Sequence, residues 1–155
     1  MYQFSNFQRA EIGPPRYPTL VDGFEGVVRI EKTYVEDTRF GAMFFCEMTV
    51  MSSNNQDNPV GQRVKWKQDL TKKDVCDNAL LQWAAGVLCV QREDEATVFA
   101  LKNALGPMMD YATIQNQEQN NFTQKYVCAK ARGMKTKNDR DFVAVDFFPY
   151  VPPAG

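Results

Sequence analysis

Between residues 63 and 87 the chain reads Arg63-Val-Lys-Trp-Lys-Gln-Asp-Leu-Thr-Lys-Lys-Asp-Val-Cys-Asp-Asn-Ala-Leu-Leu-Gln-Trp-Ala-Ala-Gly-Val87, and the period of its apolar side chains changes partway along. In the first part basic and apolar residues alternate, which predicts a strand that places Val64 and Trp66 on one face. In the second part apolar residues recur every three or four positions, which predicts an amphipathic helix. The chain therefore passes from a sheet into a helix within this stretch.

Two helices are expected in the middle of the chain. The first should begin near Thr71, because Thr71 and Asp74 resemble a capping box. The second should span about 94–105, since the consecutive acids at 93–95 favour the positive end of a helix dipole. Gly106-Pro107 predicts its end.

Strand patterns lie on both sides of these helices. Their approximate bounds are 24–35, 39–51, 61–68, 122–132 and 141–150. The alternation puts Tyr34 on the same face as Val28 and Ile30, so Tyr34 is expected in the core. This order of elements predicts a mainly β (α+β) fold, a five-stranded OB-like barrel with a helical insert between strands 3 and 4.

The chain divides into three parts by composition. Residues 1–23 contain three prolines and are expected to form an extended arm, residues 24–150 the OB-like domain, and residues 151–155 a short tail. Four apolar residues should pin the arm to the body: Phe4, Phe7, Tyr17 and Leu20. Neither a membrane span nor a signal peptide is evident, so we expect a cytoplasmic protein.

Composition argues against several classes of enzyme. The chain has no histidine, which excludes His-dependent triads and His-ligated zinc. Its four cysteines form no Cys-x-x-Cys pair, and glycine-rich phosphate loops and a Gly-x-Ser-x-Gly elbow are absent. The acids at 93–95 are read as a solvated helix start rather than a metal site. We therefore expect a binding protein that needs no cofactor or metal.

Positive charge is concentrated in two segments although the net charge is −1. Residues 63–73 carry five basic residues against one acid, and residues 125–140 carry six against one. Such rows can follow a phosphate backbone while nearby aromatic rings stack on bases. The candidate nucleic-acid-binding residues are Phe45, Arg63, Lys65, Lys67, Tyr126, Lys130, Arg132, Lys135 and Lys137.

Each of these features also has a purely structural interpretation. A basic row on a strand is commonly the solvated side of a half-buried sheet, and the loop 133–140 could be an ordinary exposed hairpin. Trp66, Trp83 and Phe44 are expected in the core. The domain could then be a structural protein or a replisome accessory protein that contacts other proteins and no nucleic acid. The proline-rich arm fits that reading, because it could dock on a neighbouring copy and form a homo-oligomer.

The layout resembles bacteriophage-type single-stranded DNA-binding proteins with an OB fold. The resemblance covers about residues 20–150 and rests on Gly26, on Gly-Ala-Met-Phe-Phe-Cys-Glu-Met-Thr-Val at 41–50 and on Pro-Val-Gly-Gln-Arg-Val-Lys-Trp at 59–66. It implies a non-enzymatic protein that coats single-stranded DNA in viral replication, recombination or repair, alongside replication proteins. Many members end in an acidic tail, whereas this chain ends in Val-Pro-Pro-Ala-Gly.

Overall fold

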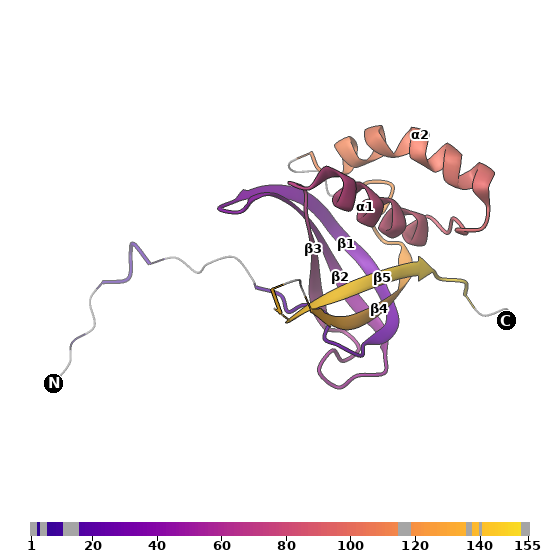
Figure 1. Cartoon of the computed structure of the whole chain (residues 1–155). Coiled ribbons are helices and arrows are strands. Elements are labelled where there is room, and N and C mark those ends of the chain that lie inside the picture. The colour runs from indigo at the N-terminus through magenta and orange to yellow at the C-terminus, as the bar shows by residue number, and fades with distance from the viewer. Residues whose placement is uncertain are drawn as a thin grey trace.

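The computed structural model describes residues 3, 6–10, 16–114, 119–135, 138–139 and 141–152. Along the chain its elements are β1 (Glu25–Thr38), β2 (Gly41–Ser53), β3 (Arg63–Asp69), α1 (Lys73–Val87), α2 (Glu95–Ala112), β4 (Tyr126–Lys135) and β5 (Asp141–Pro149) (Figure 1). The predicted mainly β fold is confirmed, with both helices between the third and fourth strands.

The strands form one antiparallel sheet in the order β3-β2-β1-β4-β5. The long strand β1 pairs with β2 from Gly26 to Thr38 and with β4 through its first residues. Within the described residues β3 and β5 are not hydrogen-bonded to each other, so the sheet is open. The sheet is nevertheless strongly curved, and the rings of Trp66 on β3 and Phe147 on β5 lie 5.0 Å apart, centroid to centroid.

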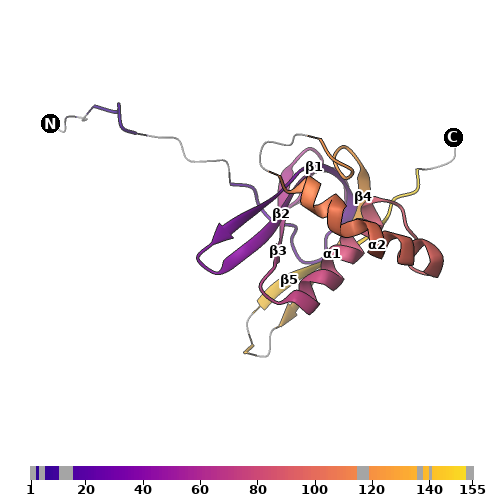
Figure 2. The same cartoon turned by 90° about the horizontal axis from the view of Figure 1, so that it is seen from above.

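The core lies between the inner face of the curved sheet and the helices (Figure 2). Trp83 of α1 is fully buried, and its ring centroid is 5.2 Å from that of Phe44 and 4.7 Å from that of Phe122. Trp66 also packs against this core. The core positions predicted for Trp66, Trp83 and Phe44 are therefore confirmed.

Two of the predicted helix boundaries need correction. The prediction of a capping box at Thr71 is wrong, because α1 begins at Lys73 and Lys72 is its N-cap residue. The Thr71 hydroxyl donates a hydrogen bond to the Asp69 carboxylate instead. The helix α2 does not end at Pro107 but continues to Ala112. The missing N–H of a proline inside a helix costs about 3 kcal/mol. Burial of the following turn offsets this cost, because Met108 and Met109 pack against the core and Ala112 is fully buried.

The last part of the N-terminal arm is bound to the sheet. The Lys65 N–H donates to the Pro18 carbonyl at 2.9 Å, and the Gly23 N–H donates to the Ala131 carbonyl at 3.0 Å. Leu20 is buried between these two points, whereas Phe7 is 68% exposed and Phe4 lies outside the described residues. Residues 18–23 thus connect the edge strand β3 with β4. Neither α1 nor α2 is long and apolar enough to cross a membrane.

Candidate nucleic-acid interface

A β-bulge in β1 decides which side chains reach the outer face of the sheet. Ile30 lies opposite Met48 but Lys32 lies opposite Glu47, so Glu31 is an extra residue in the pairing with β2. The bulge shifts the alternation by one position. The prediction of a core position for Tyr34 is therefore wrong, because Tyr34 lies on the outer face beside Phe45.

Beyond the bulge, side chains from three strands form a continuous row. Phe45 on β2 pairs with Tyr34 on β1 and with Lys67 on β3, while Glu47 pairs with Lys32 and Lys65. Because cross-strand partners project from the same face, these side chains share one surface. We call the outer-face residues Lys32, Tyr34, Phe45, Lys65 and Lys67 the β1–β3 platform. No ion pair is found for its three lysines within the described residues.

The aromatic rings of the platform lie beneath ammonium groups. The Tyr34 and Phe45 rings stack with centroids 5.2 Å apart and planes inclined by 24°. The Lys65 Nζ lies 4.8 Å from the Phe45 centroid, and the Lys32 Nζ lies 5.2 Å from the Tyr34 centroid. Phe45 is only 9% exposed, whereas Tyr34 is half-buried. Burial, and then the nearby Glu47 carboxylate, raise the pKa of Tyr34, so its hydroxyl stays neutral.

Two arginines and two glutamates occupy the middle of the same face. The Arg63 guanidinium lies 3.1 Å from the Glu47 carboxylate and 3.8 Å from that of Glu31, which is also paired with Arg29. Burial alone would raise the pKa of Glu31, but the hydrogen bond and charge of Arg29, together with the charge of Arg63, lower it overall. Arg63, predicted as a phosphate ligand, is therefore already engaged with acids on the face where Lys65 and Lys67 lie.

The N-terminal arm contributes a further ring to this surface. The guanidinium carbon of Arg63 lies 5.5 Å from the ring centroid of Tyr17, next to the hydrogen bond between Lys65 and Pro18. Sequence reasoning missed Tyr17, Lys32 and Tyr34 as surface residues of the site. Nothing in the sequence marks Tyr17. Lys32 and Tyr34 are two positions apart on one strand, so once the bulge is known their spacing indicates that both lie on the outer face.

The second basic segment lies on β4, separated from β3 by β1 and β2 in the sheet. Three of its cations have acidic partners: Lys130 is 2.9 Å from Glu25, Arg132 is 3.1 Å from Asp146, and Lys135 is 3.4 Å from Asp139.

Two further candidate residues, Tyr126 and Lys137, belong to this second basic segment. Tyr126 lies opposite Arg29, is 40% exposed and has its ring centroid 6.0 Å from that of Tyr150. Lys137 lies outside the described residues. The structure thus does not place the two basic segments on adjacent strands.

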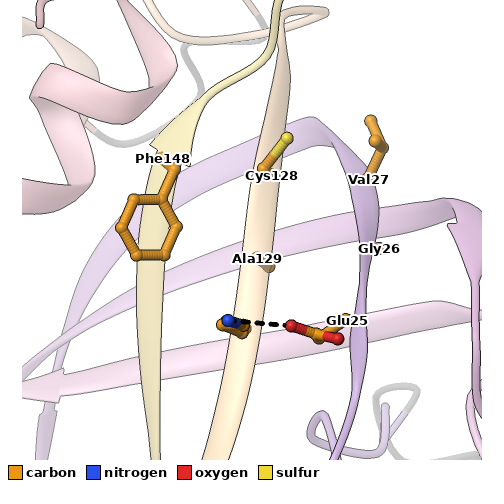
Figure 3. Close-up of a pocket in the computed structure, with 7 residues that line it drawn as sticks. Glu25, Gly26, Val27, Cys128, Ala129 and Phe148 are labelled. Carbon is orange, nitrogen blue, oxygen red and sulfur yellow. Dashed lines mark ion pairs between the residues drawn. The ribbon is translucent and has the colours of Figure 1, made fainter.

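A shallow pocket of about 540 Å³ opens on the outer side of β1, β4 and β5 (Figure 3). The ion pair between Glu25 and Lys130 crosses it, and the Phe148 ring lies at its edge beneath the Arg92 guanidinium, 4.7 Å from the ring centroid. Its lining residues are Glu25, Gly26, Val27, Cys128, Ala129, Lys130 and Phe148. The charges of this pocket are internally balanced, which makes it a weaker site for an anionic strand than the platform.

The hairpin between β1 and β2 extends beyond β3, which pairs only with Met43–Thr49 (Figure 2). At its tip Phe40 is 72% exposed, and the Arg39 guanidinium lies 4.8 Å from its ring centroid. The reversal requires Gly41, whose φ is +106°. The strand bounds expected from the sequence, 24–35 and 39–51, put the turn at 36–38, so both tip side chains were missed.

No protein-family model and no curated protein sequence matches this chain. Within the described residues, no group of three or more Cys, Asp and Glu side chains could hold a metal ion. Function is therefore inferred from the geometry and charge of the outer face.

Proposed function

We propose that this protein binds single-stranded DNA without sequence preference, through the β1–β3 platform. The observation that carries the proposal is the row Lys67–Phe45–Tyr34, which crosses three strands on one face and is flanked by Lys65 and Lys32. The layout of the chain resembles phage single-stranded DNA-binding proteins. We therefore propose that the protein coats viral DNA during replication, recombination or repair.

The platform has the two components that such binding needs. Lysines without acidic partners among the described residues can contact phosphates and release condensed counterions. Aromatic faces accept any base, and each stack contributes about 1–3 kcal/mol. Tyr34 is the accessible ring, while Phe45 supports it from the neighbouring strand. When the Lys65 ammonium moves from the ring to a phosphate, more of Phe45 becomes available to a base.

We further propose that the open sheet is an OB-like barrel interrupted between β3 and β5. In support, β1 pairs with both β2 and β4, and Trp66 approaches Phe147 where the barrel would close. OB folds bind oligonucleotides on the face of strands 2 and 3 and with the loops that join strands 1–2 and 4–5. In this chain these are the platform, the Arg39–Phe40 tip and the connection between β4 and β5.

The candidate residues then take different roles. Lys65, Lys67 and Phe45 contact DNA together with Tyr34 and Lys32. Arg63 organises the face through its acidic partners. A DNA strand that continues past β1 meets β4 next. We propose that four residues of β4 form a weaker extension of the site: Tyr126, Lys130, Arg132 and Lys135.

The test is fluorescence anisotropy with a labelled oligo-dT of about 30 nucleotides and with a duplex of equal length, at several salt concentrations. We expect preference for the single strand and a steep salt dependence. Lys65→Gln/Lys67→Gln should reduce the slope of log Kd against log salt by about 1.4, at about 0.7 per phosphate contact. Lys72→Gln/Lys73→Gln removes the same charge at the exposed start of α1 and serves as the matched control. Equal effects of the two variants would refute the platform as the binding face.

A further inference from the structure

Two carboxylates lie at the centre of the surface that is proposed to bind a polyanion. Glu47 is flanked by Lys65 on β3 and by Lys32 on β1, and Glu31 is the bulged residue next to Lys32. Their side chains are 12% and 13% exposed, so they reach the surface without being freely solvated. If this face served only to bind phosphates, replacing both glutamates by neutral residues would raise its affinity for DNA.

These carboxylates are fixed in position. Arg63 contacts both of them, and Arg29 holds Glu31 from the other side. The lysines of the platform lie around this paired centre: Lys67 and Lys65 on β3 and Lys32 on β1. The face therefore has a positive β3 edge beside a centre in which arginine charges are already neutralised by acids.

A single strand and a duplex meet this arrangement differently. A single strand that crosses the platform can place its phosphates against the lysines and turn its neutral bases toward the centre, where carboxylate oxygens accept hydrogen bonds from base N–H groups. A duplex has its bases paired inside and presents rigid rows of phosphates, so its approach to the same face brings phosphates toward Glu31 and Glu47. Without the two carboxylates, the same approach would bring the duplex phosphates to Arg29 and Arg63, so the carboxylates cancel an attraction for the duplex that the arginines would otherwise provide.

We propose that Glu31 and Glu47 determine the preference of this face for single-stranded over duplex DNA. The inference rests on the proposed function and adds the residues that exclude the duplex. Two like charges at roughly 7 Å from a phosphate, in a partly screened setting, change affinity by about tenfold. The carboxylates should therefore weaken duplex binding by about this factor and affect single-strand binding much less, because bases rather than phosphates approach them.

The experiment measures Kd for the same single strand and duplex with the full chain and with Glu31→Gln/Glu47→Gln. The amide keeps the shape and one acceptor oxygen while removing the charge. We expect duplex affinity to rise about tenfold and single-strand affinity to change less than about threefold, so that the preference ratio falls. Equal gains for both ligands, or an unchanged ratio, would overturn the inference.

The control Glu93→Gln/Asp110→Asn makes the same change in net charge at exposed positions before and within α2. It should leave the ratio unchanged, and an equal fall of the ratio would assign the effect to overall charge and overturn the inference. If the double variant does not fold, as judged by circular dichroism, Glu47→Gln alone still tests the idea, because Arg63 keeps Glu31 as a partner. A wild-type chain that binds both ligands equally removes this inference and the preference expected above, but leaves the platform as a DNA-binding face, whereas one that binds neither removes both proposals.

Discussion

Replacement of Tyr34 by alanine separates base stacking from charge in the proposed interface. The Tyr34 ring is stacked on Phe45 with centroids 5.2 Å apart, and the two rings form the aromatic surface between the lysines. Loss of one base stack corresponds to about 1–3 kcal/mol, which is a loss of affinity of about 5- to 150-fold. Because no charge is removed, the slope of log Kd against log salt should stay constant.

The assay is the oligo-dT anisotropy titration repeated at several salt concentrations. Tyr34→Phe keeps the ring and should bind within about threefold of wild type, since the stacking contribution is retained. Tyr111→Ala, which removes a ring that is 45% exposed on α2, is the control for loss of a surface tyrosine. Unchanged affinity of Tyr34→Ala, or a salt slope that falls as it does on removal of Lys65 and Lys67, would refute the assignment of Tyr34 as a stacking residue.

Three further predictions concern the fold and the arm. Trp83→Ala should lower the free energy of unfolding in urea by about 3–5 kcal/mol, because it leaves a cavity where a fully buried indole packs, and a cost under about 1 kcal/mol would contradict the core assignment. The pKa of Glu31 is lowered from its usual 4.5 in the folded state, so the ionised carboxylate stabilises the fold above that pH and this stability is lost as pH falls below it. Between neutral pH and about pH 3.5, the urea midpoint should therefore fall less for Glu31→Gln than for wild type. Deletion of residues 1–20 should lower the thermal midpoint more than deletion of 1–15, because it also removes Pro18 and the buried Leu20. We also propose that the arm joins copies of the chain, so the shorter deletion should reduce the mass measured by light scattering, and an unchanged mass would exclude that role.

Much of the architecture could be predicted because it depends on short-range patterns. Period-two alternation located the strands, and it put Arg63, Lys65 and Lys67 on one face and Trp66 on the other. The acids at 93–95 indicated the start of α2, where the Asp94 side chain accepts from the Thr97 N–H. These features follow from local geometry and burial alone.

Two of the errors, those at Tyr34 and at the end of α2, arose where a distant contact overrides the local pattern. The bulge at Glu31 is compatible with an inward-facing Thr33, whose hydroxyl donates to the Ala112 carbonyl at the end of α2. That contact joins segments 79 residues apart, and no local period encodes it. The same end of α2 exists only because the helix continues through Pro107, which local propensity disfavours. One long-range packing arrangement thus accounts for both the misplaced helix end and the misplaced Tyr34.

The distribution of ion pairs also explains how a chain with a net charge of −1 can present a surface suited to a polyanion. Acids lie beside the cations of β4, as Glu25 does beside Lys130 and Asp146 beside Arg132, so that region is close to neutral. On β3 the acids pair with Arg63, and Lys65 and Lys67 have no acidic partner among the described residues. Phosphate contacts depend on the local field within about a Debye length rather than on total charge. The segment with fewer basic residues in the sequence is therefore the one that we expect to contact DNA most strongly.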